Sequence, residues 1–131
     1  MSIGALRPPV ILAVEDNAAN RMLIQAVLEG LGYIVLLASS AAEALASMKQ
    51  QPDLILMDIQ LPGQDGLALT RLIKVDPELA AIPVVAITAH AMASDRQLCL
   101  DAGCVGFIAK PFDTRAMGAQ IRDFLEPLTR G

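Results

Sequence analysis

Five polar side chains that suit phosphoryl or metal chemistry stand where apolar runs end. Asp58 directly follows Leu-Ile-Leu-Met, and the pair Glu15-Asp16 directly follows a second apolar run. Thr88 and Lys110 each follow a further one. Carboxylates with water suit Mg²⁺, whereas a hydroxyl and an ammonium suit the oxygens of an anionic group. If the fold gathers these residues, they would form a site for a divalent cation and an anion.

The apolar runs predict the strands that would position these residues. Short continuous apolar runs bounded by turn residues are typical of strands buried on both faces of a parallel sheet. Apolar residues at helical spacing separate the runs, and Asn17 and the pair Ser40 and Glu43 are expected to cap two of the helices. The predicted strands cover residues 10–14, 33–38, 53–57, 82–87 and 105–109.

Alternating strands and helices predict a doubly wound α/β fold of the flavodoxin-like (βα)5 type. Its five parallel strands are expected in the order 2-1-3-4-5, with helices on both faces. The carboxyl ends of the first and third strands are then neighbours, so Glu15, Asp16 and Asp58 meet, with Thr88 and Lys110 on the same edge. Two carboxylates about 4 Å apart repel by about 4 kcal/mol at an effective dielectric constant near 20. Each residue alone is explained by solvation, but the whole set predicts a cation site.

Composition narrows the function classes. The chain is 54% hydrophobic and 18% charged, which predicts a folded core over about residues 10–126 of a single domain, 1–131, with a loose lead at 1–8. A net charge of −4 argues against nucleic-acid binding, and no apolar run has the roughly 18 residues that a membrane helix needs. Cys99 and Cys104 lack metal-site spacing and are expected in or near the core, in a reducing cytoplasm.

Several short motifs, specific only as a set, occur in a characteristic order over about residues 10–125. Together they resemble the receiver domain of two-component response regulators, in particular single-domain regulators and receivers attached to hybrid histidine kinases. The motifs are Val14-Glu15-Asp16-Asn17, Met57-Asp58, Pro62 with Asp65-Gly66, Thr88-Ala89 and Lys110-Pro111-Phe112.

The resemblance implies a signalling phosphoacceptor, which is not an enzyme acting on other substrates. Asp58 would accept a phosphoryl group from a phosphohistidine on a histidine kinase or phosphotransfer protein. Asp16 and Asp58 would ligate Mg²⁺ directly, Glu15 would act mainly through water, and the Gln60 carbonyl would be a further ligand; Mn²⁺ is expected to substitute. Output would be protein contact or phosphorelay.

The resemblance also assigns contacts to the transferred group. Thr88 and Lys110 would contact the phosphoryl oxygens, helped by the backbone N–H groups of Gln60 and Ala89. The Lys110–Pro111 peptide bond is expected to be cis, which proline tolerates.

Switching is expected to couple Thr88 to Phe107, an aromatic residue on the last strand that is equally well explained as an ordinary core residue. Gln60 and His90 would flank the route of attacking water and tune the acyl-phosphate lifetime. A lone histidine is more often a surface residue, so the sequence leaves the role of His90 open.

Two partner surfaces follow from the resemblance. The start of the first helix is expected to dock a kinase or phosphotransfer bundle, and the face of the fourth helix, fifth strand and fifth helix is expected to carry output, with the protein a monomer or a phosphorylation-dependent dimer. The docking candidates are Asn20, Arg21 and Met22, and the output candidates are Met92, Arg96, Arg115 and Gln120.

Other functions fit the residues less well. A flavodoxin-like electron carrier needs a hydroxyl- and glycine-rich loop where this chain has Glu15-Asp16-Asn17, which would repel a flavin phosphate. A phosphatase of the haloacid dehalogenase type needs a second aspartate where Gln60 stands. A receiver fragment of a hybrid kinase remains open, although the end at Gly131 favours a stand-alone protein.

Overall fold

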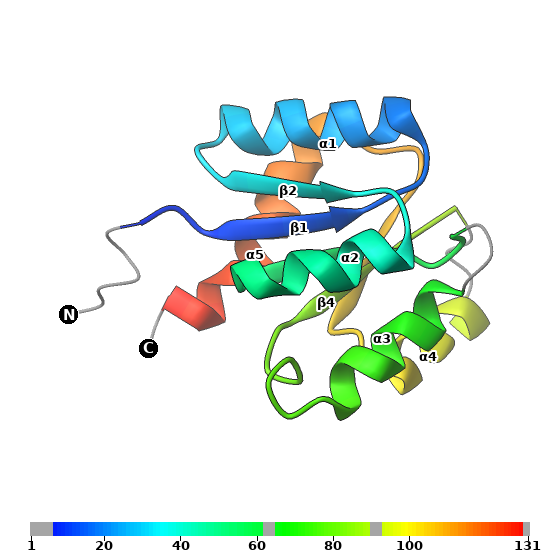
Figure 1. The fold of residues 1–131 in the computed structure, drawn as a ribbon. Coiled ribbons are helices and arrows are strands. Elements are labelled where there is room, and N and C mark those ends of the chain that lie inside the picture. Colours follow the sequence, from blue (N-terminus) through cyan, green and yellow to red (C-terminus); the bar gives the residue numbers. More distant parts are fainter. Residues whose placement is uncertain (1–6, 62–64, 90–92, 130–131) are drawn as a thin grey trace.

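The computed structural model describes residues 7–61, 65–89 and 93–129, in which strands and helices alternate along the chain (Figure 1). The elements are β1 (Val10–Val14), α1 (Ala18–Gly30), β2 (Ile34–Ala38), α2 (Ala41–Ser47), the short 3-10 helix η2 (Met48–Gln50), β3 (Leu54–Asp58), α3 (Gly66–Val75), β4 (Val84–Thr88), α4 (Ala93–Ala102), β5 (Gly106–Ala109) and α5 (Thr114–Thr129).

All five strands pair in parallel in the order β2-β1-β3-β4-β5, which confirms the predicted flavodoxin-like topology. Val14 pairs with Met57, and Thr88 pairs with Ala109, so the carboxyl ends of β1, β3, β4 and β5 lie at one edge. Helices α1 and α5 cover one face of the sheet, and α2, α3 and α4 cover the other (Figure 1).

The sheet separates two aliphatic cores, because successive side chains of a strand point to opposite faces. In β1, Leu12 and Val14 pack toward α2, α3 and α4, whereas Ile11 and Ala13 pack toward α1 and α5. The three central strands β1, β3 and β4 are buried on both faces, as their continuous apolar runs predict, whereas the edge strands β2 and β5 are only partly buried.

Side-chain caps begin the helices that follow β1 and β2. Asn17 caps α1 through a bond from the Asn20 N–H, which confirms the predicted cap. The expected capping box of α2 forms only in part: the Ser40 hydroxyl accepts from the Glu43 N–H, but the Glu43 carboxylate accepts from the N–H of Ser39 rather than that of Ser40. The start of α2 is thus anchored one residue earlier than predicted.

The segment between α3 and β4 also differs from the prediction. β4 begins at Val84, two residues later than expected, because residues 76–82 form turns such as the bond from the Leu79 N–H to the Asp76 carbonyl. The Lys74 ammonium, on the last turn of α3, donates to the carbonyls of Ala80 and Ile82 and holds this loop. The short helix η2 was not predicted.

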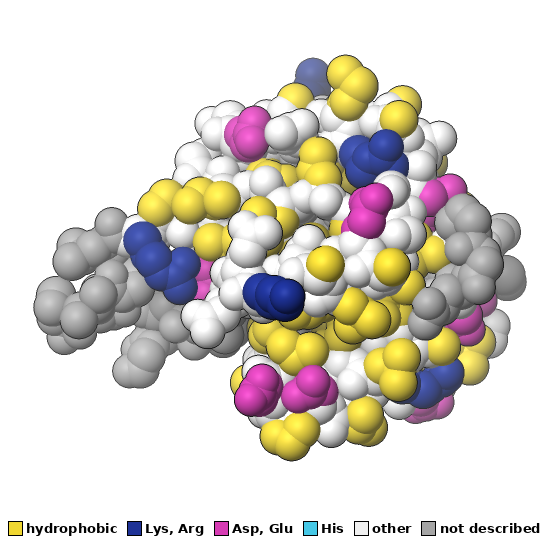
Figure 2. All heavy atoms as spheres, viewed as in Figure 1, with side chains coloured by type: hydrophobic (Ala, Val, Ile, Leu, Met, Phe, Trp, Pro, Cys, Tyr) yellow, Lys and Arg dark blue, Asp and Glu magenta, His cyan; other side chains and the backbone are white. Residues whose placement is uncertain are grey.

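Hydrophobic side chains gather between α2 and α3 in the space-filling view (Figure 2). The exposed large residues of these two helices are Leu45, Leu72 and Val75. Within the described ranges, no helix has both the length and the apolar character needed to cross a membrane.

Candidate functional site

Three carboxylates meet at the carboxyl edge of the sheet. Since Val14 is opposite Met57, the next residues, Glu15 and Asp58, are neighbours on the same face of β1 and β3. Together with Asp16 they offer carboxylate oxygens that all lie within 4.8 Å of one another. Glu15 and Asp58 are almost completely buried, whereas Asp16 is exposed.

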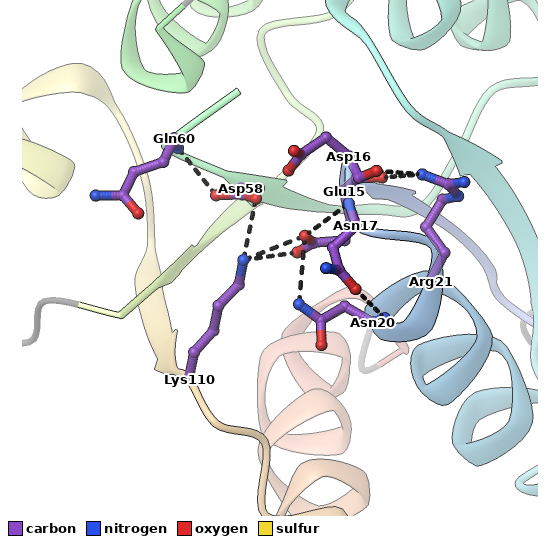
Figure 3. A network of polar contacts seen from close by, with 8 residues as sticks. All are labelled: Glu15, Asp16, Asn17, Asn20, Arg21, Asp58, Gln60 and Lys110. Atoms are coloured by element: carbon purple, nitrogen blue, oxygen red, sulfur yellow. Dashed lines mark hydrogen bonds and ion pairs between the residues drawn. The ribbon is translucent and has the colours of Figure 1, made fainter. Parts of the chain in front are cut away.

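Lys110, immediately after β5, reaches across to this acidic cluster (Figure 3). Its Nζ lies 3.1 Å from Asp58 Oδ2 and 3.0 Å from Glu15 Oε2. The Lys110 N–H donates to the Thr88 carbonyl, which ties the base of this side chain to β4. The Lys110–Pro111 peptide bond is cis. One ammonium therefore bridges two strand ends.

Burial and nearby charges together raise the pKa values of Glu15 and Lys110. Burial raises the pKa of Glu15, and the nearby charge of Asp58 adds to the rise, while the bond from Lys110 opposes it. Burial alone would lower the pKa of Lys110, but its bonds to Glu15 and Asp58 outweigh burial and raise it. Both shifts favour the protonated form, so the charged ammonium of Lys110 is stabilised, and Lys110 compensates the negative charge of Glu15 only in part.

The remaining contacts hold the carboxylates in place. Asp58 Oδ1 accepts the Gln60 N–H at 2.9 Å, so the loop after β3 turns back onto the carboxylate. Glu15 Oε1 accepts the Asn17 N–H at 3.2 Å, and the Asn20 amide approaches the same oxygen. In the segment after β1, the Arg21 guanidinium donates to the main-chain carbonyls of Glu15 and Asp16 (Figure 3).

The donor set fits a divalent cation. The Lys110 ammonium pairs with two of the three carboxylates, those of Glu15 and Asp58. Glu15 Oε2, although close to Lys110, accepts no hydrogen bond of regular geometry from any residue that the structure describes. A buried carboxylate oxygen without a donor is costly, and a hard cation such as Mg²⁺ with an oxygen ligand set would satisfy it. Asp16, open to solvent, leaves one side of the site accessible to water.

The other predicted site residues lie where the sequence suggested, as far as they are described. Thr88 is buried at the end of β4, and Ala89 follows it at the surface. Phe107 is half-buried on β5, with the Arg96 guanidinium 4.6 Å from its ring centroid. Cys99 and Cys104 are free and buried, as predicted. Pro62, His90 and Met92 lie outside the described residues.

Two contributors to the site were not predicted. Arg21 binds the carbonyls of Glu15 and Asp16, although the sequence suggested only a docking role. Gly66, the first residue of α3, lies so close to the end of β3 that a Cβ there would stand 2.2 Å from the Asp58 carbonyl oxygen. Its occurrence after Asp65 in a known motif was the only sequence signal.

A doubly wound parallel sheet with an acidic cluster and a lysine at its carboxyl edge places this chain among the α/β proteins that bind their ligands at that edge. The model of the response regulator receiver domain matches residues 11–122, and the chain therefore belongs to this family.

Curated and solved relatives agree. The chain is 40% identical over 119 residues to the polar-differentiation response regulator DivK of Brucella anthropi, covering 90% of this chain and 97% of that protein. It is 38% identical to the receiver domain of the sensor histidine kinase PA1611 of Pseudomonas aeruginosa PAO1, with a TM-score of 0.82 over 91% of this chain and 98% of that one. That structure contains a magnesium ion coordinated in the active-site cleft.

A third comparison bears on the fold alone. The chemotaxis protein CheY4 of Vibrio cholerae superposes with a TM-score of 0.84 over 88% of this chain and 98% of that one, at 23% identity.

Proposed function

We propose that Asp58 accepts a phosphoryl group from a phosphohistidine of a histidine kinase or phosphotransfer protein. The observation that carries this proposal is the Asp58 carboxylate itself, buried at the end of β3 within 3.1 Å of the Lys110 ammonium and beside Glu15 and Asp16. A carboxylate oxygen attacks phosphorus, the P–N bond breaks, and its electron pair returns to the imidazole ring. The product is an acyl phosphate on Asp58.

A divalent cation would be held by the acidic cluster and would neutralise charge on the transferred group. Asp16 and Asp58 are proposed as direct ligands, Glu15 as a ligand through water, and the Gln60 carbonyl as a further ligand. The magnesium ion in the similar kinase receiver supports this choice. Mn²⁺ is proposed to substitute, since oxygen ligands suit it as well.

The chain's own donors would stabilise the phosphoryl oxygens. Phosphoryl transfer depends mainly on positioning and on neutralising charge at these oxygens. Lys110 already points at Asp58 Oδ2, and the Gln60 N–H already binds Oδ1, so both donors are in place before the reaction. Thr88 and the Ala89 N–H, at the end of the neighbouring strand, would complete the set.

Four residues are proposed to control switching and the lifetime of the acyl phosphate. Thr88 would move toward the phosphoryl group, and Phe107 would change its packing behind it; the Arg96 guanidinium on its ring would then have to move as well. Gln60, whose side chain is exposed beside Asp58, and His90 would control access of the attacking water.

The protein is proposed to act as a single receiver unit in the cytoplasm, as a monomer or a phosphorylation-dependent dimer, catalysing only its own phosphorylation and dephosphorylation. Output by protein contact or relay would use the face of α4, β5 and α5, where Arg96, Arg115 and Gln120 are exposed.

The direct test is acyl phosphate formation with Mg²⁺, first from acetyl phosphate and then from candidate kinases. The wild-type protein should gain one hydroxylamine-sensitive phosphoryl group by intact-mass measurement, and Asp58→Asn should gain none. Asp123→Asn, an exposed carboxylate on α5, is the matched control and should behave as wild type. Equal labelling of wild type and Asp58→Asn would exclude Asp58 as the acceptor.

Kinase docking has a separate test. Met22 is 69% exposed on α1 beside the site, whereas the Arg21 guanidinium is bound to the chain itself, so Met22 is the better docking candidate. Met22→Asp should slow transfer from a phosphotransfer protein but leave labelling by acetyl phosphate unchanged. Val75→Asp, an equally exposed apolar residue on α3, controls for a general effect of added charge. An unchanged transfer rate in Met22→Asp would remove this surface from consideration.

A further inference from the structure

Glu15 and Asp16 are adjacent in the sequence, yet both of their carboxylates belong to the acidic cluster. Successive side chains of a strand point to opposite faces, and Glu15 lies on the same face as its neighbour Asp58. If β1 continued, Asp16 would point to the other face of the sheet, away from Asp58. Yet the three carboxylates lie within 4.8 Å of one another. The chain must therefore leave the extended conformation at Asp16.

Arg21 is bonded at this turn (Figure 3). Its Nη1 atom donates to the Glu15 carbonyl at 2.9 Å and to the Asp16 carbonyl at 2.8 Å. Successive carbonyls of an extended strand point in opposite directions, so one nitrogen can bind both only when the chain turns between them. The Glu15 N–H still donates to the Ala38 carbonyl of β2, so strand-like pairing reaches Glu15, and the chain bends at the next residue, Asp16.

The position of Arg21 is itself fixed. Its backbone N–H donates to the Asn17 carbonyl in the first turn of α1, and the Asn17 side chain caps that helix. The helix thus provides a rigid base from which the guanidinium holds the preceding loop. Its side chain is only half-exposed, in keeping with this intramolecular role.

We propose that Arg21 is a positioning residue for the metal ligands: by bonding both carbonyls, it holds the turn that brings Asp16 to the same side as Glu15 and Asp58. This inference rests on the proposed cation site. Groups that orient metal ligands typically change metal affinity by 10-fold or more when they are removed.

Electrostatics makes the proposal distinguishable from a simple effect of charge. A guanidinium close to a cation site repels the cation, so neutralising Arg21 would by itself strengthen Mg²⁺ binding. Loss of ligand positioning acts in the opposite direction. The sign of the change in affinity therefore separates the two roles.

The experiment is a calorimetric Mg²⁺ titration of the unphosphorylated protein. Arg21→Met should raise the Mg²⁺ dissociation constant about 10-fold. Arg21→Lys keeps the charge but lacks the planar fork, and should raise the constant by an intermediate amount. Arg122→Met, an exposed arginine on α5, is the matched control and should leave it unchanged.

A metal-free measurement completes the test. Amide resonances of Arg21→Met should shift mainly at residues 15–17, with the remaining spectrum that of a folded protein. An unchanged or lower dissociation constant in Arg21→Met would overturn the positioning role. Absence of Mg²⁺ binding in the wild-type protein would instead reject the proposed cation site, so the two failures are distinguishable.

Discussion

Two partly buried lysines lie at opposite edges of the sheet, and their pKa values shift in opposite directions. Lys110, at the carboxyl edge, faces the carboxylates of Glu15 and Asp58, which raise its pKa in spite of burial. Lys74, at the amino edge, donates to the carbonyls of Ala80 and Ile82, and burial lowers its pKa. A lysine thus belongs to a charged site at the carboxyl edge, whereas at the amino edge a lysine holds a loop through hydrogen bonds to its carbonyls.

The surroundings of the two lysines differ in the same way. The amino edge has an open pocket of about 340 Å³ with Asp123 as its single carboxylate, and no ion pair joins Asp123 to Lys74 within the described chain. The carboxyl edge has three carboxylates within 4.8 Å. Convergence of carboxylates from two other strands therefore distinguishes Lys110 from Lys74. The pocket is lined by Lys74, Ala80, Ala81, Pro83, Val105, Asp123 and Phe124.

The largest expected difference between the edges concerns two glycines. A Cβ at Gly66 would stand 2.2 Å from the backbone oxygen of Asp58, whereas a Cβ at Gly106 would meet the Phe124 ring at 2.6 Å. Backbone cannot move without displacing the site, but a ring beside a pocket can turn. Gly66→Ala should cost about 3 kcal/mol of unfolding free energy, and Gly106→Ala about 1 kcal/mol. Urea unfolding of the metal-free proteins measures both.

Labelling by acetyl phosphate sharpens this comparison. Gly66→Ala should also slow phosphorylation, because the Asp58 backbone must shift, whereas Gly106→Ala should not. Equal costs for the two substitutions, with equal labelling, would show that the carboxyl edge is no more tightly constrained than the amino edge.

The lysines themselves give the next largest effect. Lys110→Met leaves the buried carboxylates of Glu15 and Asp58 without a cation and should destabilise the metal-free protein by about 2 kcal/mol, less than for a fully buried pair because Glu15 can take up a proton. Lys74→Met leaves two carbonyls without a donor but removes a desolvated charge, so about 1 kcal/mol is expected.

Magnesium should separate the two variants. A cation that binds only the folded protein stabilises it, and in Lys110→Met the cation would also replace the missing positive charge. Saturating Mg²⁺ should therefore restore much of the stability of Lys110→Met, relative to wild type, and none of that lost in Lys74→Met. Equal responses of the two variants to Mg²⁺ would contradict the distinction between Lys110 as part of a cation site and Lys74 as a structural residue.

The residues at the carboxyl edge were predictable because the strand positions and the strand order alone bring them together. Apolar runs predicted strand positions to within two residues, and parallel strands bring their carboxyl ends to one edge, so Glu15, Asp58, Thr88 and Lys110 were expected there. These residues need only the correct strand order to meet.

The amino edge and the loop contacts were not predictable, because they depend on turns that carry no periodic pattern. The later start of β4 and the hydrogen bonds from Lys74 to the carbonyls of Ala80 and Ile82 follow from the turns of residues 76–82. Likewise, Arg21 is three residues into a helix, where nothing in its spacing indicates that it binds back to the carbonyls of Glu15 and Asp16.

The smallest expected effect tests the opposite pKa shifts directly. The folded-state pKa of Lys110 lies above the unfolded value of 10.5, so its stabilising contribution is complete below 10.5 and is lost as pH rises through the folded-state pKa. The folded-state pKa of Lys74 lies below 10.5, so the unfolded chain binds more protons in the window up to 10.5. In that window, Lys74 adds stability as pH rises.

Urea unfolding of the metal-free proteins between neutral and alkaline pH should therefore give opposite trends. The destabilisation of Lys110→Met relative to wild type should shrink above pH 10.5, and that of Lys74→Met should grow as pH approaches 10.5. Each change should be below about 1 kcal/mol, since solvent screens both partly exposed ammonium groups. Parallel trends would mean that carboxylate partners and carbonyl partners affect a lysine alike, and that convergence of charge from several strands is not what distinguishes the carboxyl edge.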